Sequence, residues 1–131
     1  MRPLRAAVLR PGKPPDAVVW PGDDDPRSGH YAIGDLAIGS VMPEGPGWRV
    51  RGMATAPEAR GRGYGALILA ALLDHVRAQG GGLVWCHARE LAVPLYERAG
   101  FEVVGEPYNL SGLGPHRRME LQPERLADRG R

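Results

Sequence analysis

The chain has 131 residues, a length typical of one domain with one hydrophobic core and too short for a comfortable second core. Hydrophobic residues make up 43% of it and charged residues 24%, so the composition excludes wholesale disorder. The formal net charge of +2 gives no support for a nucleic-acid partner, because affinity for nucleic acid depends on neutralising many phosphates.

Cysteine usage and the distribution of apolar residues bear on the cellular setting. Cys86 is the only cysteine, so no intramolecular disulfide can form. The sequence shows no charged-then-apolar leader and no uninterrupted apolar run of membrane-spanning length. We therefore expect a cytoplasmic protein without a membrane partner.

The first third of the chain predicts extended structure on both sides of a proline-rich stretch. Residues 4–10 form a candidate opening strand, whereas the prolines and glycines of 11–29 exclude a long helix. Two short extended segments follow at 30–34 and 36–42. Gly34 and the aspartate after it offer the tight connection of an antiparallel hairpin.

The middle of the chain predicts a strand, a glycine-rich turn and a helix. After a loop at 43–47, residues 48–55 alternate as a half-buried strand does. One face carries Trp48, Val50, Gly52 and Ala54, and the other carries Arg49, Arg51, Met53 and Thr55. Apolar residues recur at helical spacing within 65–79, at Leu69, Leu73 and Val76. Three glycines at 80–82 end this helix.

The last third predicts strands on either side of one short helix. In order, we expect a buried-type strand at 83–88, a helix at 91–99, strands at 101–106 and 116–121, and a polar tail over 122–131. Pro94 is tolerated because it falls in the first turn of the helix, which Gly100 closes. Residues 107–115 are expected to be a turn-rich connection, and 1–121 a single domain.

The turn before the central helix has the composition of an anion-binding loop. Gly61, Gly63 and Gly65 let a phosphate reach the backbone N–H groups, at which the positive end of the helix also points. Arg60 and Arg62 can add charge-assisted contacts.

Two other interpretations of this loop remain open on the residues alone. A chain with 19 glycines produces spaced glycine clusters by chance, so the loop is also consistent with a plain turn. Gly61, Gly63 and Ala66 also satisfy the G-x-G-x-x-G/A dinucleotide fingerprint. The dinucleotide reading is disfavoured, because the loop lies after a hairpin and too few strand–helix units follow to build a doubly wound sheet.

Two motifs, in this order, resemble the GNAT superfamily of N-acetyltransferases. Residues 60–65, Arg-Gly-Arg-Gly-Tyr-Gly, match its R/Q-x-x-G-x-G/A loop, and residues 95–101, Leu-Tyr-Glu-Arg-Ala-Gly-Phe, match its L-Y-x-x-x-G-F segment. The resemblance covers about residues 30–121, and the Gly-Pro-His at 114–116 looks like small bacterial members. It implies an α/β (α+β) fold with a mixed, mostly antiparallel sheet flanked by helices. The usual first helix pair would be reduced to the loop 11–29.

The resemblance also implies an activity and a set of site residues. The protein would transfer an acetyl group from acetyl-CoA to a primary amine, and Tyr96 would protonate the departing thiolate. The cofactor positions carried over are Met53, Ala54 and Thr55 beside the pantetheine arm, and Arg60, Gly61, Arg62, Gly63, Tyr64 and Gly65 at the pyrophosphate. A splay or bulge near Gly52–Thr55 is expected to expose main-chain N–H groups there.

The general base stays open, because Arg49 and Arg51 stand on the strand where the family commonly carries a glutamate. The candidates are His30, His87, Glu44, Glu106 or a water chain. A CoA-binding sensor without turnover is therefore the alternative function. The reduced helix pair leaves the acceptor side open, covered by 11–29 or completed by a second subunit, so a homodimer is a further possibility.

Cysteine and histidine chemistry is not expected elsewhere. Cys86 and His87 are neighbours on a strand and point to opposite faces, so they do not form a thiol–imidazole dyad, and we expect Cys86 to be a small buried residue. The four histidines show no metal-ligand spacing. We predict no metal.

Overall fold

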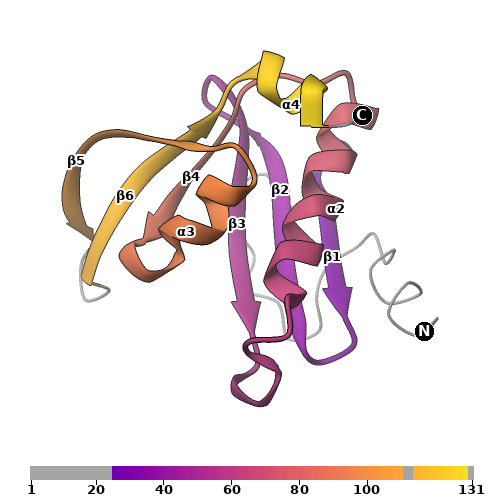
Figure 1. The fold of residues 1–131 in the computed structure, drawn as a ribbon. Coiled ribbons are helices and arrows are strands. Elements are labelled where there is room, and N and C mark those ends of the chain that lie inside the picture. The colour runs from indigo at the N-terminus through magenta and orange to yellow at the C-terminus, as the bar shows by residue number, and fades with distance from the viewer. Residues whose placement is uncertain (1–24, 111–113, 130–131) are drawn as a thin grey trace.

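A computed structural model describes residues 25–110 and 114–129 and has one six-stranded sheet at its centre (Figure 1). The strands are β1 (Gly29–Ile33), β2 (Ala37–Glu44), β3 (Gly47–Thr55), β4 (Val84–Arg89), β5 (Glu102–Leu110) and β6 (Gly114–Leu121). Their order is β1-β2-β3-β4-β6-β5, and every neighbouring pair is antiparallel except β3–β4. The expected mixed, mostly antiparallel sheet is confirmed.

The helices cover one face of this sheet. They are α2 (Tyr64–Ala78), α3 (Val93–Arg98) and α4 (Pro123–Arg129), with 3-10 turns η1 (Pro57–Ala59) and η2 (Glu90–Ala92). Figure 1 shows α2 lying over β1, β2 and β3, and the shorter α3 lying in front of β4 on the same side. The strand expected at 4–10 and most of the loop expected at 11–29 lie outside the described residues.

The hairpins form where the sequence places its turns, with one difference in length. The β1–β2 turn contains Gly34 at a positive φ of 51°, and the amide of Leu36 donates to the carbonyl of Ile33. The loop expected at 43–47 is shorter than predicted, because Pro43 and Glu44 still pair with β3. Only residues 45–46 then make the turn, which fixes the register of the strand that carries the site.

The core lies between α2 and the sheet. The apolar spacing predicted for this helix is confirmed by its buried residues, Ile68, Leu69, Leu72, Leu73 and Val76. Gly39 of β2 allows the close approach, since a Cβ there would stand 2.6 Å from Met53 Sδ and 2.7 Å from Ile68 Cγ2. Each fully buried leucine contributes about 1.5–3 kcal/mol to folding.

The C-terminal segments are more ordered than expected. Residues 122–131, expected to be a polar tail, contain α4, whose Leu126 is only 1% exposed. Arg77 Nε also donates to the Leu126 carbonyl, at 2.8 Å. The connection expected over 107–115 is largely strand, because β5 continues to Leu110 past a register shift near Gly105. Pro107 is tolerated there because β5 is an edge strand.

Candidate active site

A cleft opens where β3 and β4 separate. The two strands pair at only two positions, Trp48 with Val84 and Arg49 with Trp85. Beyond Arg49 they diverge and leave a cleft of about 430 Å³. Five of the predicted site residues line it together, namely Met53, Ala54, Thr55, Gly65 and Tyr96.

A β-bulge shapes the β3 wall of this cleft. The register between β2 and β3 shifts between Ile38 and Ser40, and Gly52 adopts a positive φ of 68°. The bulge inserts one extra residue and turns the side chains after it. Met53 therefore packs against the core, whereas simple alternation had placed it on the same face as Arg49. That assignment of faces is wrong from Gly52 onward.

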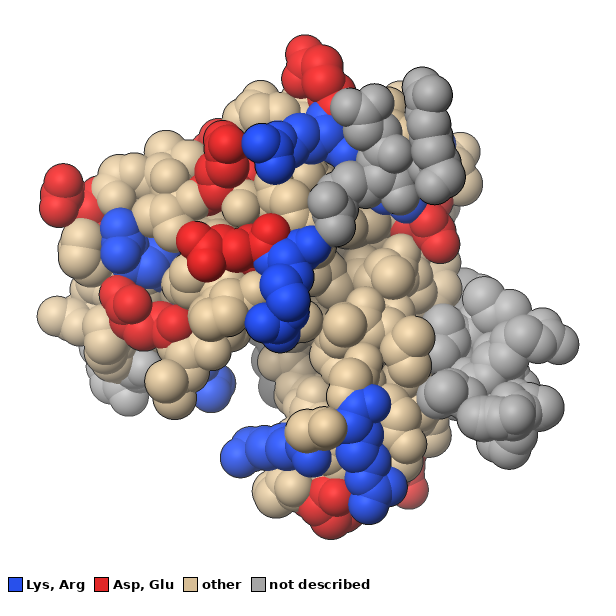
Figure 2. All heavy atoms as spheres, viewed as in Figure 1, with Lys and Arg blue, Asp and Glu red and all other residues tan. Residues whose placement is uncertain are grey.

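The glycine loop lies at the start of α2, where the backbone is open. Gly61 and Gly63 have φ values of +82° and +81°, and a Cβ on either would meet no other part of the chain within 4 Å. Helix α2 begins at Tyr64 with no side-chain cap, so its first amides have no side-chain acceptor there. Arg60 and Arg62 are exposed, and Figure 2 shows cationic side chains gathered over this loop.

Tyr96 stands on the helical side of the cleft in apolar surroundings. It is 5% exposed, and its ring packs edge-on against Phe101, with 5.3 Å between centroids. Its hydroxyl shares a hydrogen bond with the Cys86 thiol. Burial, reinforced by Cys86, raises the pKa of Tyr96, and burial raises the pKa of Cys86 to about 12. Both groups therefore keep their protons at neutral pH, and Cys86 is the buried residue predicted.

On the opposite face of the sheet, His87 reaches the same cleft and packs against two aromatic side chains. His87 Nδ1 lies 2.5 Å from the Tyr108 hydroxyl, and the His87 ring stands edge-on between Trp85 and Tyr108. Burial, followed by the charges of Arg49 and Arg118, lowers the pKa of His87. The imidazole is therefore neutral at pH 7. Cys86 and His87 face opposite sides, as predicted.

Three of the four base candidates lie elsewhere. Glu44 ion-pairs with two arginines of β3 at 3.0 and 3.9 Å, and His30 Nδ1 lies 2.8 Å from the Ser40 hydroxyl in a buried contact. Glu106 is exposed on β5. Only His87 lines the cleft.

Sequence reasoning missed a second histidine in the cleft, His116 of β6. It pairs across the sheet with Arg89 of β4 and with Tyr108 of β5. These long-range registers are not visible in the sequence. The usable signal was the alternation of residues 116–121, which puts His116 and Arg118 on one face.

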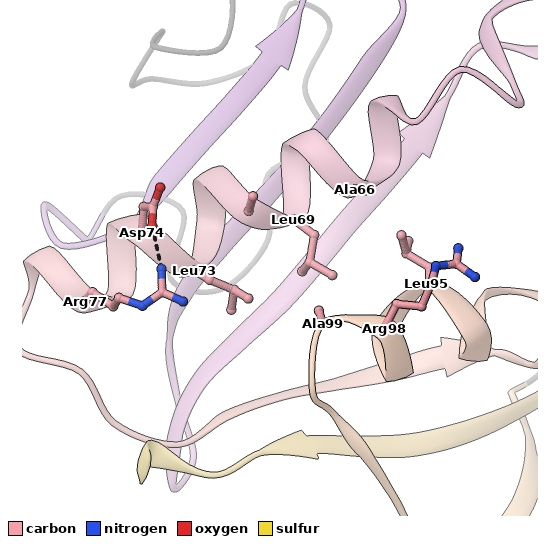
Figure 3. A pocket seen from close by; sticks show the side chains of 9 residues that line it. Ala66, Leu69, Leu73, Asp74, Arg77, Leu95, Arg98 and Ala99 are labelled. Atoms are coloured by element: carbon pink, nitrogen blue, oxygen red, sulfur yellow. Dashed lines mark hydrogen bonds and ion pairs between the residues drawn. The ribbon is translucent and has the colours of Figure 1, made fainter. Parts of the chain in front are cut away.

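An apolar groove between α2 and α3 adjoins the cleft. It has a volume of about 430 Å³, and Figure 3 shows Leu69 and Leu73 of α2 facing Leu95 of α3 and Ala99, which follows that helix, across it. Leu95 lines both the groove and the cleft. The two hollows therefore meet beside the first turn of α2.

The described part of the chain offers neither a metal-ligand cluster nor a membrane-spanning helix. Within residues 25–110 and 114–129, no three His, Cys, Asp or Glu side chains gather as metal ligands. No helix among these same residues is both long and apolar enough to cross a membrane. The dinucleotide interpretation of the loop is wrong, because the sheet has one parallel pair instead of a doubly wound parallel arrangement.

A parallel strand pair that opens beside an uncapped, glycine-initiated helix defines the acyl-CoA N-acyltransferase class of fold. Residues 31–123 match the family model described as the acetyltransferase (GNAT) domain. The chain therefore belongs to the GNAT acetyltransferase family and is an acyltransferase.

Known relatives agree with this assignment. The chain is 28% identical over 124 residues to the uncharacterized N-acetyltransferase YitI of Bacillus subtilis, covering 86% of this chain and 83% of the relative. It is similar in fold to Escherichia coli ElaA, with a TM-score of 0.67, 17% identity, and coverage of 79% and 74% of the two chains. It is also similar to an aminoglycoside 6'-N-acetyltransferase complexed with coenzyme A, with a TM-score of 0.64, 17% identity, and coverage of 75% and 74%.

Proposed function

We propose that this protein transfers the acetyl group of acetyl-CoA to a primary amine. The observation that carries the proposal is the cleft between β3 and β4, which holds a buried, protonated Tyr96 beside the main chain of the bulged strand. The uncapped first turn of α2 adjoins this cleft at Gly65. A thioester bound there would meet an acid and backbone donors at the same time.

The pyrophosphate of CoA would bind the loop 60–65. The backbone at Gly61 and Gly63 is open to an anion, and the amides at the start of α2 lack a side-chain acceptor. The exposed guanidinium groups of Arg60 and Arg62 would add charge-assisted contacts.

The pantetheine arm would run from this loop into the cleft along β3. Met53, Ala54 and Thr55 line that wall, and Leu95 offers an apolar surface opposite. A main-chain N–H at the bulge would polarise the thioester carbonyl and stabilise the tetrahedral oxyanion. Such donors contribute about 3–4 kcal/mol each to the transition state.

Tyr96 would act as the general acid. The thiolate leaves when the C–S bond breaks, and a phenol that stays protonated in apolar surroundings can supply its proton. The raised pKa of Tyr96 keeps this proton available throughout the neutral range. The phenol is regenerated by the proton that the acceptor nitrogen gives up on becoming an amide.

The proposal is tested by two measurements on the purified full chain. Calorimetry should detect binding of CoA and none of NAD. Acetyl-CoA should then be incubated with a panel of amines, amino acids and aminoglycosides, and turnover followed as thiol release. Release with at least one acceptor is the expected result. Binding of CoA without release across the panel would overturn turnover and favour the sensor alternative.

A further inference from the structure

A backbone carbonyl fixes which ring nitrogen of His116 acts as a hydrogen-bond donor. His116 is 3% exposed, and its Nδ1 lies 2.9 Å from the carbonyl oxygen of Gly114. A carbonyl oxygen can only accept a hydrogen bond, so Nδ1 carries the proton of the neutral ring. Nε2 then keeps its lone pair. The ring is prepared to accept a proton at Nε2 because its other nitrogen is already committed.

The Nε2 lone pair of His116 lies on the face of the sheet opposite Tyr96. The His116 ring lies 6.4 Å from the Tyr108 ring, and Tyr108 contacts His87, which faces away from the helices. Tyr96 reaches the same cleft from the helical side. The two walls therefore suit two proton transfers at different atoms, one to the leaving thiolate and one from the incoming amine.

Few groups in the cleft can accept a proton at neutral pH. The described residues that line it include no aspartate or glutamate. Its arginines are always charged, and the phenol of Tyr96 keeps its proton. Among these lining residues, His87 and His116 are left as the groups with a basic lone pair.

The charged and titratable groups around His116 are those of the surrounding strands. They are Arg49 of β3, His87 and Arg89 of β4, Tyr108 of β5 and Arg118 of β6. The nearby carboxylates of Glu44 and Glu120 are already ion-paired with Arg49 and Arg118. The described lining of the cleft therefore offers His116 no carboxylate partner.

His87 and His116 differ in whether a hydrogen bond fixes the tautomer of the ring. His87 Nδ1 faces the Tyr108 hydroxyl, which can donate or accept, so that contact does not decide which nitrogen carries the proton. The Gly114 carbonyl decides it for His116. We propose that His116 Nε2 is the general base that takes a proton from the acceptor's ammonium group, an inference that rests on the proposed function.

Each proton in the transfer has a defined donor and acceptor. The ammonium loses one proton to His116 Nε2, and the neutral nitrogen then attacks the thioester carbonyl to form the C–N bond. When the C–S bond breaks, the thiolate takes the phenolic proton of Tyr96. The second proton on nitrogen restores Tyr96 to the phenol, and the imidazolium releases its proton to water. The products are an amide, CoA thiol and one proton.

A matched pair of variants separates a base from a structural histidine. In His116→Asn, the amide nitrogen replaces Nδ1 and keeps the donor to Gly114, whereas the position of Nε2 is empty. In His116→Ala both are lost. With the best acceptor of the panel at pH 7, both variants should lose about 10²-fold or more in kcat/KM, the scale of a lost general base. Only His116→Ala should also lose thermal stability. Wild-type turnover in His116→Asn would overturn the proposal.

Two further readouts respond only to proton removal. The deficit of His116→Asn should shrink as the pH approaches the pKa of the acceptor amine, and it should nearly vanish with a hydrazide acceptor, whose nitrogen is unprotonated at pH 7. A deficit that is constant across pH and acceptors would overturn the role.

The tautomer itself can be measured. Nitrogen-15 NMR of the wild type should find the neutral ring protonated at Nδ1, and an Nε2–H tautomer would contradict the proposal. If the wild type itself transfers no acetyl group, the proposed function fails first.

Discussion

The two walls of the cleft differ in the way they hold protons. On the helical side, Tyr96 and Cys86 lie in apolar surroundings, and burial raises the pKa of each. On the other side, burial and two arginines lower the pKa of His87. All three groups are therefore neutral at pH 7. Tyr96 and Cys86 keep their protons, whereas the imidazole of His87 has a lone pair that can accept one. Under the proposed function, this one gap between two strands would serve both proton transfers of acyl transfer to an amine.

This contrast originates in the alternation of a single strand. Cys86 and His87 are adjacent in β4 and point to opposite faces, so one residue of sequence separates the two environments. The wall with His87 also carries cation–π contacts, since Arg49 and Arg118 stack on Trp85 at 5.2 and 4.2 Å from the ring centroid. These contacts hold positive charge close to the imidazole.

Replacing Tyr96 should have the largest effect on turnover, because it removes the ionisable group that lines the cleft on the helical side. Tyr96→Phe removes the proton donor and keeps the ring that packs against Phe101. We expect kcat and kcat/KM to fall together by about 10²-fold or more, the usual scale for a lost general acid. CoA affinity should remain nearly unchanged. Thiol-release kinetics and calorimetry measure the two quantities.

Tyr31→Phe is the matched control for this variant. Tyr31 also has a hydrogen-bonded hydroxyl, 2.9 Å from His75 Nδ1, but it lies on β1 and does not line the cleft. Its variant should keep wild-type turnover. Equal losses in both variants, or normal turnover by folded Tyr96→Phe, would make Tyr96 a packing residue.

A variant in the glycine loop tests CoA binding separately from the proton transfers at the two walls. Gly63→Leu should weaken CoA binding by about tenfold or more, since the side chain would block hydrogen bonds worth about 1.5–3 kcal/mol to a charged group. Calorimetry with CoA measures this loss. Gly80→Leu is the control, because Gly80 also has a positive φ with open space in front of it but lies at the other end of α2. If both variants lose equal affinity, strain and not blockage is the cause.

Local patterns predicted most of the fold. The hairpin at Gly34, the helix after the glycine loop and the mixed, mostly antiparallel sheet are all present. These features depend on periodicity, on turn residues or on motif order, each of which can be read within a short window. α4 could not be predicted in this way, because Leu126 is its one large apolar residue and the burial of Leu126 depends on distant partners.

The candidate site was predictable only where the chain is locally continuous. The loop 60–65 and Tyr96 follow from two sequence motifs. The orientation of Met53 does not, because strict alternation assigned the faces of β3 without the expected bulge, and the bulge reverses the alternation after Gly52. His116 was missed for a different reason. Its place in the cleft depends on the register of β6 against β4 and β5.

The helical wall, where Tyr96 and Cys86 keep their protons, should affect how stability depends on pH. The pKa of Cys86 rises from 9.0 to about 12 on folding, so between these values the unfolded chain loses a proton that the folded protein keeps. This contribution to stability is complete below pH 9 and is lost as the pH rises toward 12. Cys86→Ala should therefore cost more stability at pH 7.5 than at pH 10, as measured by urea unfolding. An equal cost at both values would contradict the raised pKa.

The opposite wall predicts a smaller effect of opposite direction, at acid pH. The pKa of His87 in the folded protein lies below its usual value of 6.5, so the unfolded chain takes up the proton first as the pH falls. The stability that the neutral ring provides is complete above about pH 6.5 and is lost as the pH falls through the folded pKa. His87→Asn removes this titration and keeps an amide beside the Tyr108 hydroxyl, so the stability difference between wild type and variant should narrow from pH 7.5 to pH 5. Thermal unfolding of both proteins at the two pH values measures it. A difference that widens at pH 5 would mean that this wall stabilises an imidazolium, and the contrast between the two walls would then be wrong.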